Sequence, residues 1–197
     1  IGEKELEALS ILAKENDILV LSDEIYIRFL YEGNHQSITK FPEMVDRTVI
    51  LDGFSKTYAM TGWRIGYGLL PDNLVEPISR LVTNSVSCTA SFTQKAALEA
   101  LTGPQDGSAK MVEEFKKRRD IVVTGLNNIS GIKCAIPKGA FYTFPNVEGT
   151  GLSSSDFANG LLEHAGVAVL SGESFGKFGK GYVRISFANS TKNLEEA

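Results

Sequence analysis

Two short apolar runs that each end in polar residues constrain the fold of this chain most strongly. The first runs from Ile18 to Leu21 and ends at Ser22-Asp23-Glu24, and the second runs from Thr48 to Leu51 and ends at Asp52. Continuous apolar runs of this kind are typical of strands that are covered on both faces. A helical pattern precedes the first run, and a longer link joins the two. We therefore predict a mainly parallel, doubly wound α/β sheet that binds ligands beyond the carboxyl ends of its strands.

The sequence after these runs predicts more of the same sheet and then a smaller domain. The segment from Gly62 to Pro71 alternates bulky residues with glycine, which predicts a third strand. Helical patterns follow near residues 73–83 and 91–101, and Thr102-Gly103-Pro104 marks a domain boundary. We predict the C-terminal part of a large domain over residues 1–103 and a small α+β domain over residues 104–197.

The small domain is expected to begin with a long helix and to continue with short strands. The helix is predicted near residues 106–128 and a second one near 154–165. Strands are predicted near residues 132–135, 140–145, 167–170 and 182–187. Both chain ends interrupt a helical pattern, because the sequence starts at Ile1 without Met and the stretch after Ser190 resembles a capped helix start. We therefore expect a portion of a longer protein, truncated at both ends.

Charge and hydropathy argue against several classes of partner. The formal net charge is -4 and the pI is about 5.3, whereas nucleic-acid binders concentrate Lys and Arg on one face. The only dense basic run, Lys116 to Arg119, follows Glu113 and Glu114, which is typical of a solvated mixed-charge helix face. No apolar stretch reaches the ~20 residues needed to cross a membrane. No secretory or transit segment opens the sequence, so the default expectation is a cytoplasmic protein without nucleic-acid or membrane partners.

The cysteines and histidines give no sign of a metal site. Cys88 and Cys134 lie far apart in the sequence and form no CxxC motif. His35 and His164 have no carboxylate or cysteine at the spacing of a metal-ligand set. We therefore expect no metal, and a structural or surface role for both histidines.

Three short motifs stand in order along the predicted large domain. They are Asp23-Glu24-Ile25-Tyr26, Ser55-Lys56-Thr57 and Gly62-Trp63-Arg64-Ile65-Gly66. Taken singly, each has an ordinary explanation as a turn former, a solvated lysine or a surface salt-bridge partner. Taken together, in this order and at these separations, they resemble the class I and II aminotransferase family. This family consists of fold type I pyridoxal-phosphate (PLP) enzymes and includes aspartate aminotransferase, and the resemblance covers nearly the whole chain as a C-terminal portion.

The resemblance implies that PLP is the cofactor and assigns a role to five residues. Lys56 forms a Schiff base with PLP and later carries a proton between the substrate α-carbon and the cofactor. Arg64 holds the phosphate through a bidentate guanidinium, and Ser55 adds a hydroxyl to the same group. Asp23 lies beneath the pyridine nitrogen, and the Tyr26 phenol donates to the ring oxygen.

In the predicted small domain, a strand from Gly181 to Phe187 matches the family strand whose arginine binds the substrate α-carboxylate. The residue at that position is Arg184, which an ordinary explanation would make an exposed strand arginine. The resemblance thus implies transfer of an α-amino group between an amino acid and a 2-oxo acid, with aspartate as the first guess for the donor.

Two alternative functions stay open because they share the same cofactor site. One is a PLP-dependent β-lyase, and the other is a PLP-sensing, aminotransferase-like domain of a transcription regulator. The resemblance also implies a homodimer for the full-length protein. About half of the cofactor cradle would lie before Ile1, so the chain alone is predicted to lack a complete site.

Overall fold

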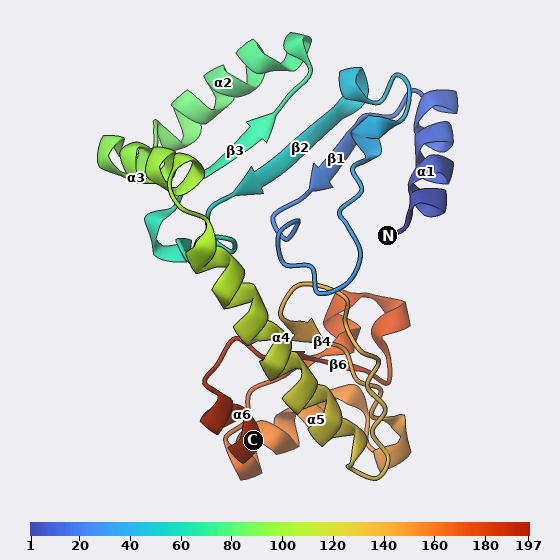
Figure 1. Cartoon of the computed structure of the whole chain (residues 1–197). Coiled ribbons are helices and arrows are strands. Elements are labelled where there is room, and N and C mark those ends of the chain that lie inside the picture. Colours follow the sequence, from blue (N-terminus) through green and yellow to red (C-terminus); the bar gives the residue numbers. More distant parts are fainter. The chain divides into compact units, whose positions relative to one another are not determined.

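The computed structural model describes residues 1–197 and divides them into two compact units (Figure 1). Unit 1 is Ile1–Ser108 and unit 2 is Ala109–Ala197. Both units combine helices with a sheet, in agreement with the predicted α/β class of the large domain and α+β class of the small one. The predicted domain limits at residues 103 and 104 stay a prediction. None of the helices has both the length and the apolar character that a membrane crossing demands.

Unit 1 contains a three-stranded sheet in the order β1-β2-β3, as Figure 1 shows. The strands are β1 (Val20–Asp23), β2 (Thr48–Gly53) and β3 (Gly66–Leu69). β1 runs parallel to β2, with Asp23 opposite Leu51, and β3 runs antiparallel to β2, with Gly66 opposite Gly53. The carboxyl ends of β1 and β2 and the start of β3 therefore lie at one edge of the sheet.

The predicted third strand begins later than the sequence pattern indicates. Residues Thr61–Trp63 form a 3-10 helix, η3, and the strand begins only at Gly66. The Trp63 N–H donates to the carbonyl of Met60 at 3.1 Å, so this backbone closes a turn and forms no ladder with β2. The prediction of a strand from Gly62 is wrong for these first residues.

Unit 1 has three helices, and two of them, the first and the third, supply its apolar cores. The helices are α1 (Glu3–Glu15), α2 (Asp72–Val86) and α3 (Ser91–Thr102), with short 3-10 turns η1 (Ile38–Lys40) and η2 (Val45–Arg47) between β1 and β2. α1 buries Leu6 and Ala13 against Ile38 and Met44. α3 places Ala97 in a second cluster that also contains Phe54 and Met60.

The expectation that both faces of the sheet are covered is wrong for this chain. Along β1, half-buried and exposed residues alternate, and Leu21 is 67% exposed. All four residues of β3 are exposed. Because successive side chains of a strand point to opposite faces, this alternation means that only one face of β1 packs against the rest of the chain.

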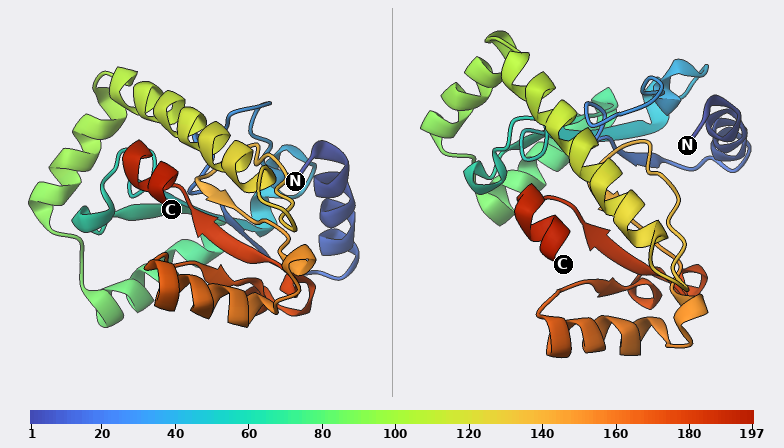
Figure 2. Two further views of the ribbon diagram at one scale, coloured as in Figure 1. Left: turned by 90° about the horizontal axis from the view of Figure 1, so that it is seen from below. Right: turned by 60° about the horizontal axis from the view of Figure 1, so that its bottom comes forward.

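Unit 2 is built on the long helix α4 (Asp106–Asn127), which belongs to this unit from Ala109 onward, and on a three-stranded antiparallel sheet in the order β4-β6-β5. The strands are β4 (Tyr142–Thr143), β5 (Leu170–Ser171) and β6 (Val183–Ser186), and their core consists of Ile132, Val147 and Val183. α5 (Ser154–Gly160, orange in Figure 2) packs beside β5, and η5 (Leu161–Ala165) continues α5 as a π-helix. The remaining elements are η4 (Glu148–Thr150), η6 (Gly172–Phe175), η7 (Lys177–Gly179) and α6 (Thr191–Glu196).

The prediction of a strand over residues 132–135 is also wrong. Only Lys133 forms an isolated bridge, with Asn146. The Asn127 side chain accepts from the Cys134 N–H and donates to its carbonyl, both at 2.9 Å, so these backbone groups are already satisfied at the end of α4. At the other end of the unit, the capped helix start is confirmed, because the Ser190 hydroxyl accepts from the Asn193 N–H at 3.2 Å.

Candidate functional site

The turn after β1 presents Asp23 and Tyr26. Asp23 is the last residue of β1, and its Oδ1 accepts from the Ile25 N–H at 3.2 Å. The Glu24 N–H donates to the carbonyl of Leu51 at 2.8 Å, which ties this turn to β2. The two residues of the first motif are therefore fixed at the carboxyl edge of the sheet, where the sequence predicts a ligand site.

Lys56 lies on a tight turn that follows β2 and is anchored on both sides. Phe54 and Thr57, its neighbours in the turn, are buried. The Phe54 carbonyl accepts from the N–H groups of Tyr58 and Met60 at 3.2 and 3.3 Å. These buried neighbours and hydrogen bonds fix the backbone of the turn. They therefore limit the positions that the Lys56 side chain can reach.

Arg64 caps η3 in an unusual backbone conformation. Its φ and ψ are both 53°, in the left-handed region that residues other than glycine seldom adopt. Such strain is found preferentially at functional sites. Its Nη1 donates to the Thr61 carbonyl at 2.8 Å, and this bond orients an otherwise exposed guanidinium. The remaining N–H groups can serve a ligand anion.

These segments meet in one cavity with a volume of about 360 Å³. An amine, two carboxylates, a guanidinium and a serine hydroxyl are among the groups that line it. The lining residues are Asp23, Ile25, Leu51, Asp52, Ser55, Lys56, Thr61 and Arg64. Four of the predicted site residues therefore lie together, and Tyr26 is close, because its ring centre is 6.0 Å from the Lys56 Nζ.

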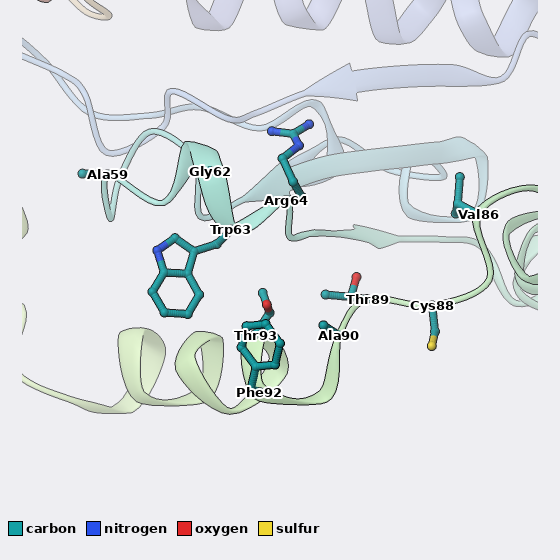
Figure 3. A pocket seen from close by; sticks show the side chains of 10 residues that line it. All are labelled: Ala59, Gly62, Trp63, Arg64, Val86, Cys88, Thr89, Ala90, Phe92 and Thr93. Atoms are coloured by element: carbon teal, nitrogen blue, oxygen red, sulfur yellow. The ribbon is translucent and has the colours of Figure 1, made fainter.

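Arg64 also lines a second cavity of about 830 Å³, which is shown in Figure 3. In that view Trp63 and Phe92 point toward each other, while Arg64 points to the opposite side. The other lining residues are Ala59, Gly62, Val86, Cys88, Thr89, Ala90 and Thr93. The second cavity is therefore largely apolar, and the polar groups of the site belong to the smaller one.

Sequence reasoning missed the pair formed by Asp52 and Tyr67. The Tyr67 hydroxyl donates to the Asp52 Oδ2 at 2.6 Å, and the Gly53 N–H donates to Oδ1 at 2.6 Å. Partial desolvation of the phenol raises the pKa of Tyr67 to about 12, and the hydrogen bond from the phenol to the Asp52 carboxylate adds to this increase. The two residues face each other across the β2–β3 ladder, and only the register of that ladder brings them together.

A second missed feature is a buried carboxylate next to Asp23. Glu24 is only 8% exposed, and its Oε2 lies 2.7 Å from the His35 Nε2. Its Oε1 accepts from the hydroxyls of Ser37 and Ser22 at 2.8 and 3.2 Å. This network ties residues 35–37 to the end of β1. His35 thus has a carboxylate partner that its sequence spacing did not suggest.

Arg184, the predicted substrate residue, lies on β6 in unit 2. Its Cζ is 4.7 Å from the ring centre of Tyr142 and 4.5 Å from that of Phe175. No carboxylate of unit 2 lies within ion-pair distance of this half-buried guanidinium. Its N–H donors can therefore serve a ligand anion.

Comparison with known proteins gives one consistent result. The aminotransferase class I and II family matches residues 1–197. The aspartate aminotransferase of Pyrococcus horikoshii is 44% identical over 99% of this chain and 50% of its own length. The probable N-acetyl-LL-diaminopimelate aminotransferase of Bacillus subtilis is 43% identical over 100% of this chain and 49% of its own.

The similarity extends to solved structures. The crystal structure of an aromatic aminotransferase from Pyrococcus horikoshii superposes with a TM-score of 0.95 at 40% identity, over 100% of this chain and 53% of that chain. The chain thus spans about half the length of the curated relatives it matches. Members of this family depend on PLP. On the match over its whole length, the chain belongs to the class I and II aminotransferase family.

Proposed function

We propose that the protein is a PLP-dependent aminotransferase that moves an α-amino group between an amino acid and a 2-oxo acid. The observation that carries this proposal is the cavity at the carboxyl edge of the unit 1 sheet, which gathers Asp23, Ser55, Lys56 and Arg64. Relatives named for aspartate, aromatic and diaminopimelate substrates support amino transfer without favouring one donor. Aspartate stays the first donor to test.

The residues of this cavity fit the chemical groups of PLP. The Lys56 amine matches the aldehyde, the Asp23 carboxylate matches the pyridine nitrogen, and the Arg64 guanidinium with the Ser55 hydroxyl matches the phosphate. When bound, PLP supplies an aldehyde that reacts with amines and a ring that draws electrons from the substrate α-carbon.

Each residue of the cavity has a definite task in this proposal. Lys56 would hold the cofactor through its amine and would carry a proton from the substrate α-carbon. Asp23, held by the Ile25 N–H, would supply a negative charge that favours the protonated ring nitrogen. Tyr26, near the Lys56 amine, would donate a hydrogen bond from its phenol to the ring oxygen.

The proposal also includes one residue outside this cavity and two properties of the full-length protein. Arg184 would bind the substrate α-carboxylate, because its guanidinium has no carboxylate partner within unit 2. We also include the homodimer that the family resemblance implies and the cytoplasmic location that is the default expectation.

A donor panel tests this function. The full-length protein, loaded with PLP, is given aspartate, aromatic, alanine or branched-chain donors with 2-oxoglutarate as acceptor. We expect transfer from at least one donor, and a loss of about a hundredfold or more in Lys56→Ala, since Lys56 moves the proton. Lys4→Ala, on the exposed side of α1, is the matched control and should keep full activity. Elimination without any need for the acceptor would contradict amino transfer.

A further inference from the structure

The strand β6 presents Arg184 on the face that lies away from the core. Val183 is fully buried in the core of unit 2, and Ile185 packs against the same cluster. Because side chains alternate along a strand, Arg184 points to the other face. Tyr142 lies opposite Ser186 in the β4–β6 ladder, so it shares a face with both Ser186 and Arg184.

Phe175 reaches the same face from the loop that follows β5. It is the last residue of η6, and its ring packs edge-on against Phe144 with a centre-to-centre distance of 6.0 Å. Gly172 and Gly179 approach so closely that a Cβ on either one would overlap the carbonyl of the other. This contact closes the loop at its base and therefore fixes the position of Phe175.

The two rings hold the guanidinium without using its hydrogen-bond donors. Both ring centres lie well within the ~6 Å at which an aromatic face attracts a cation. A carboxylate partner would occupy the N–H groups of Arg184, whereas an aromatic face leaves them available. The rings also remove water from the apolar sides of the guanidinium, which strengthens its attraction for an anion.

We propose that Tyr142 and Phe175 are positioning residues that hold Arg184 ready for the substrate carboxylate. This inference rests on the proposed function, because it needs Arg184 to bind that carboxylate. The α-carboxylate takes no part in bond making, so it is held alike in the ground state and the transition state. Loosening Arg184 should therefore raise KM and leave kcat nearly unchanged.

The test is a double-mutant cycle in the full-length, PLP-loaded protein. Phe175→Leu removes one ring at a position that is 49% exposed, where folding should tolerate the change. We expect KM for the best amino donor to rise about threefold to tenfold, with kcat within about twofold. Phe178→Leu is the matched control: it changes a phenylalanine of the same loop that is 86% exposed and contacts Lys177 instead, and it should leave KM unchanged.

The second half of the cycle introduces the same change into an Arg184→Lys background. Lysine has no planar guanidinium to stack, so Phe175→Leu should then change KM by less than about twofold. An equal rise in both backgrounds would mean that Phe175 contacts the substrate directly, which overturns the positioning role. If KM is unchanged in Phe175→Leu but raised in Arg184→Lys, the positioning role is overturned and the role of Arg184 stands. Unchanged KM in Arg184→Lys overturns the proposed role of Arg184 as well.

Discussion

Tyr67 is hydrogen-bonded to a residue of the candidate cavity, and the titration of its phenol can be measured. Its hydroxyl donates to Asp52, a residue that lines the cavity. Partial desolvation of the phenol raises the pKa of Tyr67 from 10.0 to about 12, and the Asp52 carboxylate contributes through the hydrogen bond and its charge. Because folding raises this pKa, the shift stabilises the folded state fully at any pH below the unfolded-state pKa of 10.0. That stabilisation is lost as the pH rises from 10.0 to about 12.

We therefore predict that Asp52→Asn lowers the pKa of Tyr67 but leaves it above 10.0, because the partial desolvation of the phenol remains. Titration of tyrosinate absorbance, compared with Tyr67→Phe to identify the signal, measures this shift. The free energy of unfolding should also fall less steeply in Asp52→Asn than in the parent as the pH rises from 10.0 to about 12. An unchanged Tyr67 titration in Asp52→Asn would show that the hydrogen bond contributes nothing.

Sequence motifs located the cavity residues but not their neighbours. Asp23 and Lys56 each follow an apolar run, and parallel strands bring their carboxyl ends to one edge, so their proximity could be predicted. The pairing of Asp52 with Tyr67 depends on an antiparallel register, and the contact of Glu24 with His35 depends on the path of a loop. Neither leaves a periodic signal in the sequence.

At the scale of elements, long periodic segments were predicted well and short ones poorly. The helices α3 and α4 begin at the predicted residues, Ser91 and Asp106, because their apolar periodicity extends over several turns. In unit 2, by contrast, β4 and β5 have two residues each, and a side chain takes the place of the strand expected at residues 132–135. Tertiary hydrogen bonds decide such short elements, and local propensity does not.

The loop between β5 and β6 gives a prediction at this scale. Gly179→Ala should destabilise the protein by about 2 kcal/mol, because the new methyl group would overlap the backbone of Gly172. The matched control is Gly125→Ala in α4, where a Cβ meets nothing within 4 Å. That change should instead stabilise the helix by about 0.5 kcal/mol or more. Urea unfolding of both variants measures the difference, and an equal effect of the two would contradict the proposed close contact.

For the whole molecule, the most conspicuous feature is the amount of apolar surface that the chain exposes. Leu21, Leu81, Val86 and Phe92 are between 67% and 71% exposed, and they come from β1, α2 and α3. Soluble monomers seldom expose large contiguous apolar areas, and such areas bind apolar dyes or other protein surfaces. Of these residues, Leu21 lies on a face of β1 that the apolar sequence pattern predicts to be covered, so the structure differs from that prediction here.

We predict that residues 1–197 alone enhance the fluorescence of the dye ANS several-fold more, per mole, than the full-length protein does. The measurement is made in native buffer, with far-ultraviolet circular dichroism to verify that the chain is folded. We expect the longer protein to cover these exposed side chains, and equal dye fluorescence from the two proteins would contradict that expectation.

The proposed function depends most on Lys56 as the residue that carries the cofactor. The most direct test is to incubate the full-length protein with PLP, reduce it with borohydride and map the labelled peptide by mass spectrometry. We expect the label on Lys56, because its side chain lines the cavity with Asp23 and Arg64. We expect no stoichiometric label in Lys56→Arg. Stoichiometric labelling of a different lysine, or none at all, would contradict the assignment of this cavity as the cofactor site.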